Sequence, residues 1–332
     1  MDKDLELYDV TIIGGGTTGL YAAFYSGLRE MKTKLIEASS HFGGKVALFY
    51  PEKNVYDLGA MPGATGEEIV QQTMKQAHMF DPTMIHNQWV ETIEKKADGT
   101  FFLTTAGGEI HWSKTIILAA GNGEFSIVGP ELFDVKKDEN VHTTMENWKQ
   151  YEGKRVVIFT NSRIGLDWAC KIESIAKQVY VCNQKTTYQK AKEKDFQRLA
   201  ESSIKEQNGV ILKEVSRQHN QVKEVMVVNS NGVEERIVVD DVLVYEGIEQ
   251  RSAPSQAWGL DTEQGRVLTN TEMTTNIEGL FVAGDTAIYP GKTNLIATGY
   301  TEAMAAVNSA KRYINPKASA QIYTTVIFRD KN

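Results

Sequence analysis

The stretch YDVTIIGGGTTG at residues 8–19 decides the fold. It joins a short, β-branched apolar run to a glycine-rich turn, and a helical pattern follows over residues 20–29. A second apolar run at residues 33–36 ends on Glu37. A strand, a glycine turn, a helix, a second strand and an acid within about 30 residues are typical of a dinucleotide-binding βαβ unit. The sequence therefore predicts an α/β protein.

Each glycine of this turn has a mechanical role. Gly14 permits the tight turn, Gly16 lets the backbone approach a pyrophosphate, and Gly19 allows the helix and strand to pack closely. The helix N-terminus offers N–H groups and its positive dipole end to the phosphates. Glu37 can accept hydrogen bonds from ribose hydroxyls. These residues, with Thr18 between them, are the predicted binding site for a dinucleotide.

A second segment, residues 274–285, is an apolar strand that ends in Gly284-Asp285. Glycine lets the backbone pass close to a flavin chain, and Asp285 can accept a hydrogen bond from a ribityl hydroxyl. The helical pattern at residues 298–314 can point its N-terminus at the flavin pyrimidine edge, which gains negative charge on reduction. Together with the first motif, this segment indicates FAD as the cofactor.

A second strand–turn–helix unit begins at residues 155–159, and its helix starts near Gly165. Further strand-like runs follow at 178–182, 224–229 and 236–245. With the first unit, they predict two Rossmann-like domains, which suits a length of 332 residues.

Composition excludes several classes of function. A net charge of −7 argues against nucleic acid as a partner. No apolar run is long enough for a membrane span, and the N-terminus lacks the layout of a signal peptide, so we expect a cytoplasmic protein. Cys170 and Cys182 do not form a Cys-x-x-Cys pair, and the six histidines show no metal-ligand spacing. We therefore expect no metal.

Several strings of the sequence carry a resemblance to one family. They are the Gly14–Gly19 turn, Gly43-Gly44-Lys45, Tyr50-Pro51-Glu52-Lys53, Ala283-Gly284-Asp285, Gly291-Lys292, Leu295-Ile296-Ala297-Thr298-Gly299, Glu302-Ala303 and Ala306-Val307-Asn308. The chain resembles the thioredoxin-reductase-like ferredoxin–NADP+ reductases of bacteria over nearly its whole length. The resemblance implies a homodimer and a thioredoxin-reductase-like architecture. It implies an FAD domain made of residues 1–118 and 247–332, with an NAD(P)H-binding-like domain at 119–246.

The resemblance also implies roles around the flavin. Glu37 binds the FAD ribose, and Lys45 stands where the family often has Gln. Tyr50 matches the aromatic residue that stacks on one flavin face, where it excludes water. Val90 contacts the adenine end through its backbone, and Phe125 lies near the flavin.

The C-terminal segment of the family reaches the partner subunit's flavin. Tyr323 here replaces the usual stacking His, and tyrosine cannot carry a proton near neutral pH as histidine can. Thr324 or Thr325 could donate a hydrogen bond to flavin N5. A disordered tail is the alternative.

The chain departs from the family where NADPH should bind. In the second glycine motif, two of the three glycine positions are Thr160 and Ser162, and only Gly165 survives. A side chain at Ser162 stands where the backbone should approach the pyrophosphate, and the β-branched Thr160 restricts the turn.

The string that should grip the 2′-phosphate has also changed. It reads Asn183-Gln184-Lys185 and lacks the paired arginines that bind phosphate bidentately. Arg163 could contact a phosphate or could be a solvated surface arginine. The two losses concern the same ligand, so binding of NADP(H) or NAD(H) is doubtful.

Three functions remain open. The first is an enzyme in which FAD relays electrons between NAD(P)H and a ferredoxin or flavodoxin. The second is a similar flavoprotein that is reduced by a different donor. The third is a flavin-bound module without turnover.

Overall fold

The computed structural model describes residues 5–49, 51–135, 137–145, 147–320 and 322–323. The chain divides into two compact units, residues 1–124 with 251–332 and residues 125–250. The first unit is thus assembled from two separate parts of the chain.

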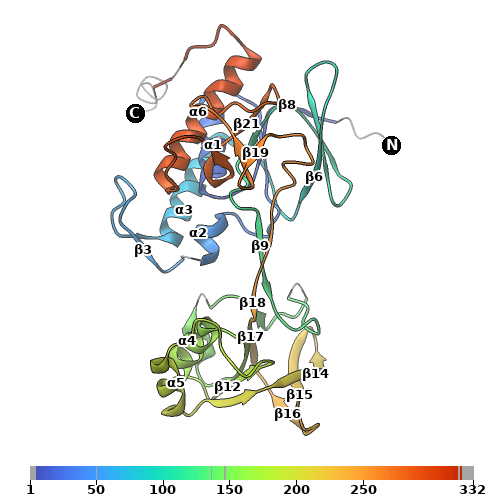
Figure 1. Cartoon of the computed structure of the whole chain (residues 1–332), viewed down its shortest axis with the longest axis vertical. Helices are drawn as coiled ribbons and strands as arrows, with labels where there is room; N and C mark the ends of the chain where they lie inside the picture. The colour runs from blue at the N-terminus through green and yellow to red at the C-terminus, as the bar shows by residue number, and fades with distance from the viewer. Residues whose placement is uncertain (1–4, 50, 136, 146, 321, 324–332) are drawn as a thin grey trace. The chain divides into compact units, whose positions relative to one another are not determined.

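A mixed sheet forms the centre of the first unit (Figure 1). Its strands are β1 (Leu7–Ile13), β2 (Thr33–Ile36), β5 (Thr83–Ile85), β6 (Val90–Lys95), β7 (Phe101–Thr105), β8 (Ile110–Leu118) and β21 (Leu280–Val282). Their order is β5-β2-β1-β8-β7-β6, and β21 also pairs with β8. The pairs among β5, β2, β1, β8 and β21 are parallel, whereas β6 and β7 are antiparallel additions.

The register of this sheet brings four strand ends into one row. Ile13 pairs with Ile36 and with Leu118, and Val282 pairs with Leu118. The residues after these strands therefore emerge at the same edge of the sheet. Ligands of open α/β sheets bind beyond the carboxyl ends of the strands.

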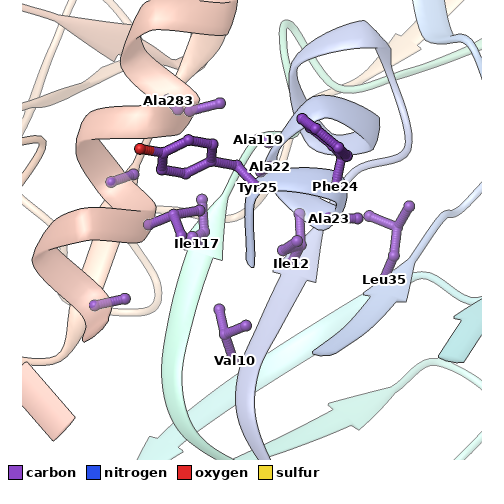
Figure 2. Close-up of a cluster of buried hydrophobic side chains, with 14 of the residues drawn as sticks. Val10, Ile12, Ala22, Ala23, Phe24, Tyr25, Leu35, Ile117, Ala119 and Ala283 are labelled. Atoms are coloured by element: carbon purple, nitrogen blue, oxygen red, sulfur yellow. The ribbon is translucent and has the colours of Figure 1, made fainter. Parts of the chain in front are cut away.

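Helices cover the sheet and build its core. The helices of this unit are α1 (Thr17–Leu28), α2 (Gly44–Phe49), α3 (Gly66–Ala77), η1 (His78–Phe80), η3 (Gly284–Thr286) and α6 (Ile296–Ile314). Figure 2 shows apolar side chains of β1 and α1, including Ile12 and Ala23, gathered beside α6. Ala303 and Ala306 on α6 are fully buried in this cluster, and such small side chains let the two helices approach closely.

Short strands complete the first unit. They are β3 (Asn54–Val55), β4 (Ala64–Thr65), β19 (Thr262–Glu263), β20 (Arg266–Leu268) and β22 (Ala287–Ile288). β22 follows η3 directly in sequence and pairs in parallel with the earlier strand β20, so this pairing fixes the chain that leaves the second motif.

The second unit contains a five-stranded sheet and a three-stranded sheet. The first is β10 (Val141–His142), β17 (Asp241–Tyr245), β11 (Arg155–Thr160), β12 (Gln178–Asn183) and β13 (Lys205–Asn208), in that order; the second is β14 (Val210–Gln218), β15 (Gln221–Asn229) and β16 (Glu234–Val238). The other elements are η2 (Trp148–Tyr151), α4 (Arg163–Ile172), α5 (Glu193–Ala200) and the paired strands β9 (Glu124–Val128) and β18 (Gly247–Arg251). The pairs of the five-stranded sheet are parallel, as in a Rossmann-like domain.

The prediction of one strand from the sequence is wrong. The apolar run at residues 236–245 is not a single strand, because β16 ends at Val238 and β17 begins at Asp241 in the other sheet. At the break, the Asp240 carboxylate accepts hydrogen bonds from Nε and Nη2 of Arg155 at 2.9 and 2.8 Å. The break coincides with the adjacent acids Asp240 and Asp241, with apolar residues on both sides.

Candidate functional site

In the turn between β1 and α1, Gly14 and Gly19 must be glycine because neighbouring atoms of the protein leave no room for a side chain. Gly14 has a φ of +104°, a conformation that side chains rarely adopt. A Cβ atom on Gly14 would lie 2.5 Å from the carbonyl oxygen of Ala119. A Cβ atom on Gly19 would lie 1.8 Å from the carbonyl oxygen of Gly14. These two positions close the turn tightly.

Gly16 differs from both, because none of its described neighbours requires it to be glycine. Its φ of −68° and ψ of 179° suit any residue, and the nearest atom to an added Cβ would be Cα of Gly44, at 3.8 Å. No side chain caps the N-terminus of α1 at this position. Bare backbone beside an uncapped helix N-terminus is the arrangement that a diphosphate needs. The turn therefore fits the diphosphate of a dinucleotide such as FAD.

Glu37 lies directly beside this turn, just after β2. Its carboxylate accepts hydrogen bonds from the N–H of Gly15 at 2.5 Å and of Ser39 at 2.8 Å. Burial raises the pKa of Glu37, although both hydrogen bonds oppose the shift. The N–H of Gln88 donates to the Glu37 carbonyl at 2.9 Å, which brings the chain before Val90 to the same edge. The geometry thus groups Glu37 and the start of β6 beside the glycine turn.

The second motif packs onto the first. A Cβ atom added to Gly284 would lie 3.0 Å from Oγ1 of Thr18, and one added to Gly299 would lie 2.4 Å from the same atom. Thr18 on α1 is therefore held between η3 and the first turn of α6. The two motifs, far apart in sequence, form one site.

Lys45 and Asp285 also meet at this site. The segment before α2 is joined to the glycine turn, since Gly43 N–H donates to the Gly15 carbonyl at 2.8 Å. The Nζ of Lys45 then lies 2.5 Å from Oδ2 of Asp285. Their side chains are 32% and 26% exposed, so the ion pair is partly shielded from water.

Sequence reasoning gave Glu302 no role beyond membership of a family string. Its carboxylate is 2% exposed and accepts hydrogen bonds from Gly284 N–H and the Tyr289 hydroxyl, both at 2.7 Å. Lys292 Nζ lies 2.5 Å from the same group. Glu302 thus ties α6 to both ends of the segment that carries Asp285. The sequence does contain one signal for this role, because Glu302 is an acid on the apolar face of a helix rich in alanine.

The hydrogen bonds and packing described above do not test several of the predicted contacts with the flavin. Tyr50, Thr324 and Thr325 lie outside the described residues. Tyr323 is 60% exposed. Phe125 is half-buried in β9. Their roles at the flavin remain predictions.

The turn between β11 and α4 is filled by its own side chains. Thr160 Oγ1 accepts a hydrogen bond from Ser162 N–H at 3.1 Å. A Cβ atom on Gly165 would lie 2.4 Å from the Thr160 side chain, so this side chain lies against the base of the helix. Gln189 then pairs with the turn, accepting from Arg163 N–H at 2.9 Å and donating to the Asn161 carbonyl at 2.7 Å. Two N–H groups suited to a phosphate therefore have partners within the protein.

The Arg163 side chain also has partners within the protein. Its Nε lies 3.1 Å from Asp195 Oδ2 and 3.7 Å from Asp167 Oδ2. The arginine therefore has acidic partners in the unliganded protein, and its contact with a phosphate stays a prediction.

The 183–185 segment forms a tight local turn. The buried Asn183 accepts from Lys185 N–H at 2.8 Å and donates to the Thr187 carbonyl at 3.1 Å. Gln184 and Lys185 are exposed. Asn183 is therefore committed to the turn, and Lys185 is the one cation of this string.

Comparison with known proteins shows the family of this chain. Residues 8–310 match the family described as pyridine nucleotide-disulphide oxidoreductase. The chain belongs to this family. A ferredoxin–NADP reductase of Geobacillus kaustophilus is 39% identical over 330 residues, which cover 98% of this chain and 99% of that protein. Ferredoxin–NADP reductase 2 of Bacillus subtilis is 37% identical over 335 residues, covering both proteins completely.

Solved structures identify the architecture of this family member. The thioredoxin reductase of T. acidophilum aligns with a TM-score of 0.56 at 19% identity, over 94% of this chain and 99% of that one. That of Lactococcus lactis gives 0.55 at 20% identity, over 92% and 99%. The predicted thioredoxin-reductase-like α/β fold is thereby confirmed, and the chain is an oxidoreductase of the ferredoxin–NADP reductase type.

Two features are absent from the part of the chain that the structure describes. Within the described ranges, no helix is long and apolar enough to cross a membrane. Among the same residues, no cluster of three His, Cys, Asp or Glu side chains is arranged to hold a metal ion.

Proposed function

We propose that this chain is an FAD-dependent oxidoreductase that passes electrons to or from a ferredoxin- or flavodoxin-type carrier, with weak or lost use of NADPH. The names of its relatives support the reaction class and ferredoxin as the carrier. The observation that carries the proposal is the contrast between the two turns. The first turn is open at Gly16, and the second is filled by Thr160. We further propose that the working protein is a homodimer.

The residues of the first site would hold FAD from its adenine end to its flavin. Bound FAD supplies the exchange between hydride and single-electron transfer. Gly16 and the N-terminus of α1 receive the diphosphate, and Glu37 accepts hydrogen bonds from the adenosine ribose. Asp285 accepts a hydrogen bond from the ribityl chain. These groups bind and orient the cofactor, and burial of Glu37 keeps water from its carboxylate.

The second turn supports only weak binding of a nicotinamide nucleotide. The diphosphate would have to displace the Thr160–Ser162 and Gln189–Arg163 hydrogen bonds before gaining its own. The 2′-phosphate of NADPH would meet Lys185 without an arginine pair. Both effects weaken binding of the nicotinamide nucleotide, and neither involves residues of the FAD site.

The experiment that tests this proposal is an anaerobic titration of the yellow protein with NADPH and then NADH. We expect the flavin absorbance band to decrease slowly or not at all with either nucleotide, and fully with dithionite. Rapid stoichiometric bleaching by NADPH would contradict the proposed loss of NADPH use. Failure to purify with, or to bind, FAD would contradict the flavoprotein assignment itself.

Restoring the glycines of the second turn should increase the use of both nucleotides. In Thr160→Gly/Ser162→Gly, the N–H of residue 162 loses its acceptor and is freed, the Arg163 N–H keeps its bond to the Gln189 carbonyl, and the backbone can approach a diphosphate. We expect flavin reduction by NADPH and by NADH to become about tenfold faster at subsaturating nucleotide, because about 1.4 kcal/mol of binding is regained. Equal gains for the two nucleotides would follow, since both carry the diphosphate.

The matched control is Thr160→Ser, which keeps the hydroxyl that accepts from Ser162 N–H. Its reduction rates should equal those of the unmodified protein. If the double variant were no faster than this control, the filled turn would not be the cause of weak nucleotide use.

A donor other than NADPH is the second candidate function. The filled turn of the second unit favours it, because the flavin would then need another source of electrons. Reduction of the flavin by a reduced ferredoxin, in a protein that NADPH leaves oxidised, would establish it. A flavin that exchanges electrons with no carrier would instead indicate a module without turnover.

A further inference from the structure

The Lys45–Asp285 ion pair joins the two motifs that frame the proposed FAD site. Lys45 belongs to α2 and Asp285 to η3, and the two residues are separated by 240 positions. Close to Lys45, Gly43 N–H donates to the Gly15 carbonyl, and next to Asp285, Gly284 lies close to the Thr18 side chain. The pair is therefore a built feature of the site and not a chance contact between flexible surface side chains.

Charge at this edge of the sheet makes Lys45 distinctive. Glu37, Asp285 and Glu302 are gathered here, and Lys292 is already paired with Glu302. Among the described residues, Lys45 is the partner found for the Asp285 carboxylate. Without Lys45, this carboxylate would lose its hydrogen-bond donor and the positive charge beside it.

The ion pair has consequences for a bound flavin. A carboxylate held by one oxygen keeps a defined direction for its second oxygen, which can then accept from a ribityl hydroxyl. A partly buried positive charge also acts over several ångströms with little screening. Lys45 offsets the negative charge of Asp285, and removing Lys45 would disfavour the reduced flavin, because reduction adds negative charge.

We propose that Lys45 is a positioning residue for FAD that fixes Asp285 and also shifts the flavin reduction equilibrium toward the reduced form. The inference rests on the proposed binding of FAD and concerns how this chain sets the potential of the cofactor.

Two variants separate the two effects. Lys45→Gln removes the charge but keeps a donor for Asp285, whereas Lys45→Met removes both. The control is Lys32→Gln, which removes the same charge from an exposed pair with Glu6, where the side chains are 48% and 58% exposed. The readouts are the dissociation constant of FAD and the equilibrium of flavin reduction against a reference dye under anaerobic conditions.

For Lys45→Gln we expect a two-electron reduction equilibrium about tenfold less favourable, equal to about 30 mV, with an FAD dissociation constant within about threefold of the unmodified protein. For Lys45→Met we expect the same shift and FAD binding about tenfold weaker. Lys32→Gln should change neither. If Lys45→Gln and Lys45→Met both matched Lys32→Gln in both readouts, the proposal would be overturned. If the unmodified protein bound no FAD, the proposed function would fail first.

Discussion

Replacing Gly16 by alanine is expected to weaken FAD binding about 100-fold while leaving the fold of the apoprotein intact. The protein leaves room for the added methyl group, and the backbone conformation of Gly16 suits alanine. The methyl group would instead occupy the space that a diphosphate needs. Losing one or two hydrogen bonds to a charged phosphate costs about 3 kcal/mol, which is about 100-fold in affinity.

The measurement is a titration of apoprotein with FAD, followed by flavin fluorescence, together with the circular dichroism and melting temperature of the apoprotein. Gly59→Ala is the matched control, because a Cβ atom there meets nothing within 4 Å, whereas one on Gly16 makes only an ordinary contact at 3.8 Å, and the φ of Gly59 is not positive. The control should bind FAD normally. An unchanged affinity in Gly16→Ala would mean that no diphosphate lies against this turn.

The sequence predicted the parts of the site that depend on local chemistry. Gly14 and Glu37 each come directly after a strand, Gly19 lies in the first turn of the helix that follows Gly14, and strand ends can be recognised from short apolar runs. Since parallel strands end at one edge, placing these residues together needs only the order of the strands. In the structure Ile13 pairs with Ile36, so β1 and β2 end side by side.

Contacts between distant segments could not be predicted in the same way. Neither Lys45 nor Asp285 carries a local sign of the other, because their meeting depends on how α2 and η3 both pack at the glycine turn. The loss of glycine at Thr160 was visible in the sequence. The sequence did not show that Ser162 N–H donates a hydrogen bond to Thr160 Oγ1, which takes the place of a phosphate oxygen as its acceptor.

Glu302→Ala is expected to lower the free energy of unfolding by about 3–5 kcal/mol. The substitution would leave Lys292, whose side chain is 5% exposed, as a buried cation without its partner. It would also remove the acceptor of Gly284 N–H and of the Tyr289 hydroxyl. Burial and the neighbouring Glu302 raise the pKa of Tyr289 to about 12, so this hydroxyl remains a donor at neutral pH and would also lose its acceptor.

Urea unfolding of the protein with saturating FAD measures the loss, and Glu272→Ala on the same scale is the control. Glu272 pairs with Arg312 of α6 at 3.1 Å, but their side chains are 58% and 42% exposed, so the control should lose less than about 1 kcal/mol. Equal losses in the two variants would show that Glu302 is an ordinary surface acid in solution. A large loss confined to Glu302→Ala, with weaker FAD binding, would mean that this carboxylate holds the segment between Gly284 and Lys292 in the shape that the cofactor requires. The stability of α6 and the geometry around Asp285 would then depend on the same buried group.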